Sequence, residues 1–104
     1  MIEYEIKKPS YKIKIVVDVY FDYHAVRYTV RDVLTCAKGK RKWLSSANLI
    51  RDRHEYRSLD LDKKSDYAKA EYLKICTEDD IAAALRFAYE KMKPNEGNTT
   101  FRVI

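Results

Sequence analysis

The chain has 104 residues, of which 46% are hydrophobic and 36% charged, and its formal net charge is +5. This length fits one domain, and the composition is that of a globular chain rather than a disordered one. Two glycines and two prolines are too few for a glycine-rich phosphate loop or a collagen-like repeat. No apolar run approaches the roughly 20 residues that a membrane span needs. The N-terminal segment has neither a basic start nor an apolar core, so we expect a cytoplasmic protein without a secretory signal.

Alternating residues predict a β-hairpin at the N-terminus. Residues 2–7 and 11–22 both place apolar side chains at every second position, and the second run is rich in β-branched residues. Pro9 lies between the two runs, where its fixed φ and missing N–H donor suit a turn. We therefore expect a long second strand that buries one face.

Residues 24–37 fit two patterns. Their apolar residues include a set at the spacing of one helical stripe, Val26, Val30, Val33, Leu34 and Ala37. Gly39 then stands where a helix often ends in a left-handed residue. The same segment also alternates at Val26, Tyr28 and Val30, as a strand would. We expect a helix here, with a strand as the alternative.

The second half of the chain predicts mostly helix. Residues 43–57 indicate a helix or helical turn that Ser45 or Ser46 can cap, whereas residues 67–76 suit either a helix or a short strand. With a strand there, the element order would resemble the β-grasp outline. Thr77-Glu78-Asp79-Asp80 is similar to a capping box and predicts a helix up to about residue 92.

Residues 99–104 predict a strand that closes the sheet. The expected fold class is therefore α+β. We expect a single domain over residues 1–104, with an N-terminal β-hairpin, two to four helices and a C-terminal strand.

No common catalytic motif is present, so we expect no enzyme and no cofactor. Cys36 and Cys76 have no metal-ligand spacing, and we expect two free, buried thiols in a reducing compartment. Asp18 and Asp22, with His24 beyond them, would lie on one face of the long strand. Carboxylates and a histidine placed in this way can bind a divalent metal ion, so a small metal-dependent nuclease is a third hypothesis. A solvated strand face explains the same residues without a metal, and we expect no metal site.

The positive charge is concentrated in the middle of the chain. Residues 27–57 contain nine basic and three acidic residues, whereas residues 1–26 contain four of each. The candidate binding residues in and beside this segment are Arg27, Arg31, Lys38, Lys40, Arg41, Lys42, Trp43, Arg53, Arg57, Tyr20 and Tyr28. Clustered cations attract phosphates, and tyrosine is enriched where proteins contact partners. The alternative is a solvated face that only keeps the chain soluble.

Two binding functions follow from this pattern. The first is a small protein that docks through a basic, tyrosine-bearing face on a host nucleic-acid-handling protein or nucleoprotein complex. Its size and composition resemble those of phage- or mobile-element-encoded accessory proteins, including inhibitors. The alternative is direct, non-specific binding of DNA or RNA. The expected partner is therefore a protein or nucleoprotein, or a nucleic acid, and not a membrane.

Overall fold

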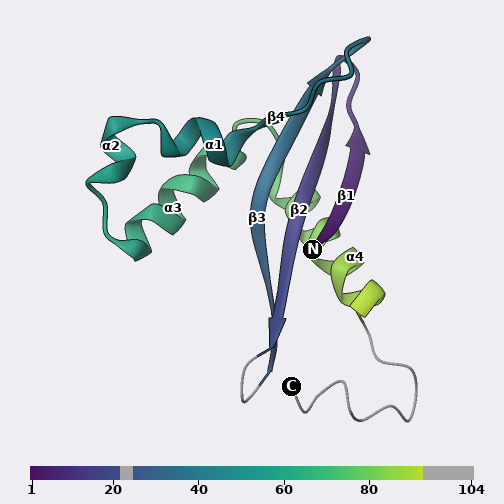
Figure 1. Cartoon of the computed structure of the whole chain (residues 1–104). Coiled ribbons are helices and arrows are strands. Elements are labelled where there is room, and N and C mark those ends of the chain that lie inside the picture. The colour runs from purple at the N-terminus through teal and green to yellow at the C-terminus, as the bar shows by residue number, and fades with distance from the viewer. Residues whose placement is uncertain (22–24, 93–104) are drawn as a thin grey trace.

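The computed structural model describes residues 1–21 and 25–92 (Figure 1). One antiparallel sheet has the strand order β1-β2-β3-β4, with β1 at Ile2–Lys7, β2 at Tyr11–Phe21, β3 at Val26–Ala37 and β4 at Leu44–Ser45. The helices in the described ranges are α1 at Ser46–Arg51, α2 at His54–Arg57, α3 at Leu61–Tyr72 and α4 at Glu78–Met92. The α+β class is thus confirmed, whereas the strand expected at 99–104 lies outside the described residues.

The predicted hairpin forms, and its alternating residues build the core. β1 pairs with β2 from Ile2 opposite Val17 to Lys7 opposite Lys12. Ile13, Ile15 and Val17 are completely buried beneath α4. α4 contributes alanines at its buried positions, and their small side chains let the helix approach the sheet closely. One face of the sheet is therefore covered by α4, and the ends of the long strands β2 and β3 extend beyond this helix (Figure 1).

The helix expected over residues 24–37 is wrong, because Val26–Ala37 form β3. The physical reason is a β-bulge. β3 pairs Val30 with Val17 and Val33 with Ile15, so Arg31 is an extra residue that β2 does not match. The bulge brings two valines three residues apart onto the same buried face, and in the sequence this spacing is typical of a helix. The alternative of a strand was the correct one.

The helical part of the prediction is confirmed with different boundaries. Residues 43–57 contain β4, α1 and α2, and Ser45 is the residue that caps α1. α3 continues to Tyr72 and a turn follows, so the strand alternative for 67–76, and with it the β-grasp outline, is wrong. The expected capping box is present, since the Asp80 amide donates to Thr77 Oγ1 at 3.1 Å and the Thr77 amide to Asp80 Oδ2 at 3.0 Å.

Both cysteines are free and buried, as expected. The Cys36 thiol donates to the carbonyl oxygen of Lys40 at 3.1 Å, and burial raises the pKa of Cys76 to about 11. A thiol with such a pKa is almost entirely protonated at neutral pH and is a poor nucleophile. Among the described helices, none is long and apolar enough to cross a membrane.

Asp32 connects the sheet to the helices. Its Oδ1 accepts the Ala47 amide of α1 at 2.8 Å, and its Oδ2 accepts the Ser45 hydroxyl. The same Ser45 oxygen accepts the Asn48 amide at 3.2 Å, so one carboxylate and one hydroxyl satisfy the start of α1 together. Tyr72 adds a second link, donating its hydroxyl to the Arg31 carbonyl oxygen at 3.2 Å.

We expect Asp32→Ala to lower the free energy of unfolding by about 2 kcal/mol, because it leaves half-buried donors of Ser45 and Ala47 without an acceptor. Urea denaturation followed by circular dichroism measures the change. Asp62→Ala, at an exposed position in the first turn of α3, is the control and should cost well under half as much. An equal loss in both variants would contradict the structural role of Asp32.

Candidate functional site

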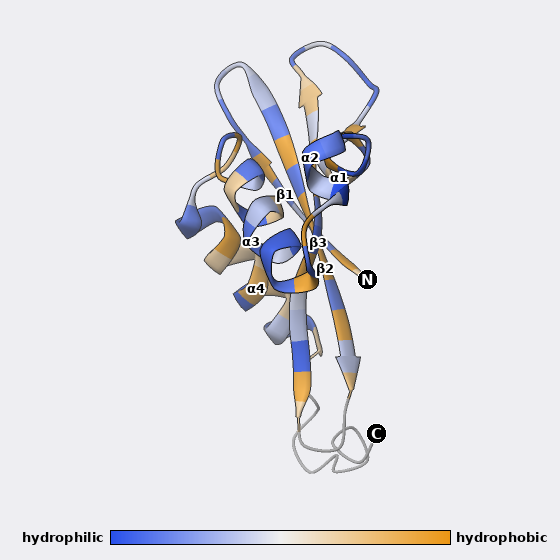
Figure 2. Cartoon of the chain, turned by 90° about the vertical axis from the view of Figure 1, so that its left-hand side faces the viewer, coloured by the Kyte–Doolittle hydropathy of each residue, from blue (hydrophilic) through white to orange (hydrophobic). Residues whose placement is uncertain are grey.

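Two connections that are distant in the sequence meet at one end of the sheet. The first is the turn between β1 and β2, and the second is the loop of residues 38–43 between β3 and β4 (Figure 2). The Lys38 amide donates to the Ser10 carbonyl oxygen at 3.3 Å and joins them. Gly39 turns the second loop with a φ of +80°, a conformation that glycine adopts at little cost. Figure 2 shows both connections in blue and pale blue, the colours of hydrophilic residues.

A cavity of about 440 Å³ lies between these connections. Six of its lining residues are cationic, and we call them the basic end: Lys7, Lys8, Lys12, Lys38, Lys40 and Arg41. The other lining residues are Pro9, Tyr11, Ala37 and Gly39, so no carboxylate lines the cavity. Converging like charges raise the local positive potential, which attracts anions.

Two of the six cations have carboxylate partners. Lys8 Nζ lies 2.8 Å from Asp80 Oδ2, and Lys12 Nζ lies 3.7 Å from Glu5 Oε1. The hydrogen bond with Asp80 raises the pKa of Lys8 above its ordinary value. Among residues 1–21 and 25–92, no carboxylate forms an ion pair with the remaining four. Most of the positive charge at this end is therefore available to an external anion.

Trp43 orders the second loop against the sheet. Its ring lies under two ammonium groups of β2, with Lys14 Nζ 4.3 Å and Lys12 Nζ 5.4 Å from the ring centroid. Such cation–π contacts are worth about 0.5–1 kcal/mol each at exposed sites. Because two ammonium groups lie over the half-buried ring, Trp43 positions the basic loop and presents less surface for stacking on a base.

The structure gathers only part of the expected binding set at this end. Lys38, Lys40 and Arg41 line the cavity, and Lys42 and Trp43 belong to the same loop. Lys42 itself is exposed beside the cavity without lining it.

The other expected cations lie elsewhere. Arg27 and Arg31 are on β3, where Arg31 forms a 3.0 Å ion pair with Asp18 across the hairpin. Arg53 forms a 3.1 Å ion pair with Glu71, and Arg57 lies at the end of α2. These four residues do not contribute to the basic end.

The two expected tyrosines lie at the opposite end of the sheet from the basic end. Tyr20 is opposite Arg27 near the far end of the β2–β3 ribbon, and its side chain is 49% exposed. Tyr28 is half-buried, with its ring centroid 6.0 Å from that of Tyr89 in α4. Tyr20 therefore remains accessible, while Tyr28 covers the rim of the core.

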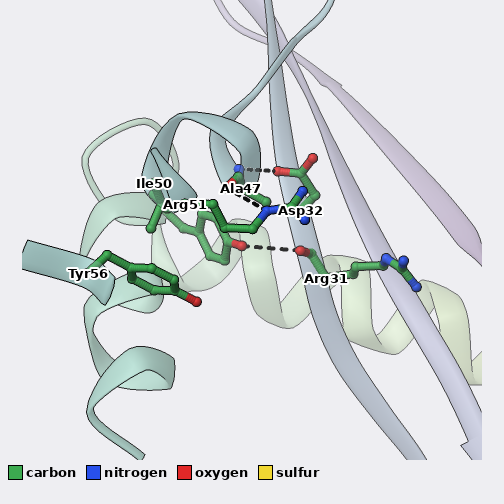
Figure 3. Close-up of a pocket in the computed structure, with 7 residues that line it drawn as sticks. Arg31, Asp32, Ala47, Ile50, Arg51 and Tyr56 are labelled. Atoms are coloured by element: carbon green, nitrogen blue, oxygen red, sulfur yellow. Dashed lines mark hydrogen bonds between the residues drawn. The ribbon is translucent and has the colours of Figure 1, made fainter. Parts of the chain in front are cut away.

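A second cavity, of about 280 Å³, lies between β3 and the helices α1–α3 (Figure 3). Arg31 borders it, but Figure 3 shows its guanidinium pointing away from the cavity. The Arg51 guanidinium is hydrogen-bonded to Asn48 and to the Ala47 carbonyl oxygen. Burial raises the pKa of Tyr72 to about 12, so its hydroxyl stays neutral. Asp32 also lines the cavity, but its carboxylate already accepts the Ser45 hydroxyl and the Ala47 amide. The charged groups of this cavity are therefore turned away from it or bonded within the protein.

The acidic residues considered as metal ligands do not converge in the described parts of the chain. No group of three or more His, Cys, Asp or Glu residues there has the geometry to hold a metal ion. Asp18 is instead paired with Arg31 at 3.0 Å. Asp22 and His24 lie outside the described residues.

Comparison with protein-family models, with curated proteins and with solved structures finds no match to this chain.

Charge counting along the chain missed Lys7, Lys8 and Lys12, since residues 1–26 are neutral in total. A usable signal was nevertheless present. In a three-stranded meander, the turn after the first strand and the loop after the third lie at the same end of the sheet. Treating residues 26–37 as a strand would have placed these lysines beside residues 38–42.

The Lys8–Asp80 ion pair makes stability depend on pH. Burial raises the pKa of Asp80, but hydrogen bonds from Lys8 and Thr77 outweigh this effect and hold it below its ordinary value of 3.8. The stabilisation is therefore present above pH 3.8 and is lost as the pH falls through the lower folded-state pKa.

We expect Asp80→Asn to be less stable than the wild type at pH 7, with the difference shrinking in strong acid. Urea denaturation at a series of pH values measures this, with Asp79→Asn, an exposed neighbour, as the control. A difference that does not change with pH would contradict the assignment.

Proposed function

We propose that this chain is a non-enzymatic binding protein whose basic end binds the phosphate backbone of nucleic acid. One observation supports the proposal most directly: six cations from two distant segments line a single cavity that no carboxylate lines. Fixing phosphates beside such cations releases counterions from the nucleic acid and relieves the repulsion among the cations.

The chemistry of the basic end favours binding without sequence readout. Lysine ammonium groups contact phosphates as point charges, and the Arg41 guanidinium can bind two phosphate oxygens at once. The major groove, which carries the full base code, admits a helix or a two-stranded ribbon, whereas the basic end consists of a turn and a loop. Backbone contacts position a protein on nucleic acid but carry no direct sequence information.

Fluorescence anisotropy with labelled 20-base-pair DNA duplexes of two unrelated sequences tests this proposal. For about five phosphate contacts, affinity should fall on the order of several hundred-fold between 50 and 200 mM salt. The two duplexes should bind with similar affinity. Trp43, the single tryptophan of the chain, gives an independent signal, because displacing Lys12 or Lys14 from its ring should change its fluorescence.

We expect Lys40→Glu/Arg41→Glu to weaken duplex binding at least tenfold and to reduce the salt slope by about two, because it removes two phosphate contacts. Arg57→Glu/Lys63→Glu is the matched control, since it removes the same charge from exposed helical positions outside the basic end. Equal weakening in both variants would show that only net charge matters. That result, or binding insensitive to salt, would contradict the proposal.

Docking on a nucleic-acid-handling protein or nucleoprotein complex is the second candidate. It is favoured by Tyr20, which is half-exposed on the β2–β3 ribbon. This part of the ribbon extends beyond the pair of Ile2 and Val17, where the pairing with β1 ends. A phage- or mobile-element-type accessory protein or inhibitor would fit this mode of action. In this case the ribbon, and not the basic end, would contact the protein partner.

We expect Tyr20→Ala to abolish capture of a nuclease-resistant partner from lysate, if the ribbon is the docking surface. Leu61→Ala, at another highly exposed apolar residue, is the control and should leave capture unchanged. Retention of the partner by Tyr20→Ala would contradict this surface. Loss of all captured material after nuclease treatment would favour the direct binding of nucleic acid.

A further inference from the structure

No described strand or helix covers the outer hydrogen-bonding edge of β1. β1 is the first strand of the sheet, and among residues 1–21 and 25–92 no strand pairs with its outer side. Its six residues contain no proline, and their register with β2 has no bulge. Proline and β-bulges are two of the devices by which natural proteins prevent strand pairing at an edge. β1 has neither of them.

The opposite edge of the sheet differs. β4 covers the end of β3, the Tyr72 hydroxyl donates to the Arg31 carbonyl oxygen, and the bulge at Arg31 interrupts the strand. Figure 1 shows the helices α1–α3 on that side and β1 on the other. Within residues 1–21 and 25–92, the fold therefore protects one edge of the sheet and leaves the β1 edge open.

The hairpin geometry determines which backbone groups of β1 face outward. The Lys8 amide donates to the Tyr11 carbonyl oxygen at 2.8 Å, which defines a hydrogen-bonded pair at the turn. Such pairs alternate along an antiparallel ladder, so Ile6, Tyr4 and Ile2 bond to β2. The amides and carbonyls of Glu3, Glu5 and Lys7 consequently point to the open edge.

We propose that a second copy of this chain pairs antiparallel with this edge, about a two-fold axis at Glu5. In this register Glu3 of each copy lies opposite Lys7 of the other, which gives two cross-strand pairs of opposite charge. Tyr4 lies opposite Ile6 on the face that α4 covers, where the Tyr4 ring already packs on Phe87 at 5.0 Å. Pairing would therefore continue both the polar and the apolar face of the sheet.

Charge and the length of β1 together favour this register over its neighbours. A shift that centres the axis on Tyr4 would place Glu3 opposite Glu5 twice, a destabilising pair of like charges. A shift that centres it on Ile6 would place Glu5 opposite Lys7 twice, but it would bring Glu3 opposite Pro9, where the strand has ended, so that only residues 5–7 of the two strands would pair. In the proposed register the two Glu5 residues face each other once, and Lys12 of the same chain lies 3.7 Å from each carboxylate.

Disulfide trapping tests the register on the full chain without nucleic acid. Residues of a hydrogen-bonded antiparallel pair have Cα atoms about 5.5 Å apart, which a disulfide can span. With oxidised glutathione, Glu5→Cys should form a covalent dimer, whereas Glu3→Cys should form one only when mixed with Lys7→Cys. The wild type is the control, because both of its cysteines are buried. Trapping by Tyr4→Cys instead of Glu5→Cys would overturn the register.

Sedimentation equilibrium tests the pairing energetics. The wild type should show a concentration-dependent monomer–dimer equilibrium, and Glu3→Lys or Lys7→Glu should each weaken it about tenfold, because each creates two like-charge pairs. The double variant Glu3→Lys/Lys7→Glu should restore dimerisation. Glu78→Lys is the matched control for Glu3→Lys, since Glu78, like Glu3, has a carboxylate 3.7 Å from a lysine ammonium group but lies outside β1. A wild type that stays monomeric at all concentrations, or a double variant that is not restored, would overturn the proposal.

Discussion

The carboxylate of Asp32 is the interaction on which the arrangement of this chain depends. It lies on a central part of β3 and accepts the first hydrogen bonds of α1, so it fixes where the chain must return after leaving the sheet. β4 pairs Ser45 with Leu34 and Leu44 with Thr35 beside it. Residues 38–43 are therefore anchored at both ends, and the loop stays next to the turn between β1 and β2.

This anchoring explains why repelling cations can be held together. Lysines brought within one cavity oppose folding, and the repulsion is only partly offset by carboxylates at its margin, Asp80 and Glu5. The Trp43 ring makes cation–π contacts with Lys14 and Lys12, and these modestly stabilising contacts hold the loop against β2. A bound polyanion would remove the remaining repulsion, so strain of this kind is expected where proteins bind phosphates.

The sequence predicted those elements whose signals are local. The first hairpin follows from alternation, and α4 follows from the Thr77–Asp80 capping box and a helical stripe. β3 was misassigned because the bulge at Arg31 gives Val30 and Val33 a helical spacing, and bulges depend on the partner strand. The candidate site was half predicted for the same reason. Lys38, Lys40 and Arg41 form a local cluster, while Lys7, Lys8 and Lys12 join them only through the pairing of three strands.

Lys7 links the two proposals, because it lines the basic cavity and is also the last residue of the open β1 edge. If Glu3 of a second copy pairs with Lys7, one cation fewer is available to phosphate, and a phosphate at Lys7 likewise competes with that carboxylate. Linkage requires these effects to be reciprocal: nucleic acid weakens dimerisation by the same factor by which dimerisation weakens the binding of nucleic acid. The coupling is limited to about one phosphate contact, since the other five cations of the basic end lie outside β1. In the proposed dimer, pairing at β1 would therefore modulate the proposed binding at the basic end without abolishing it.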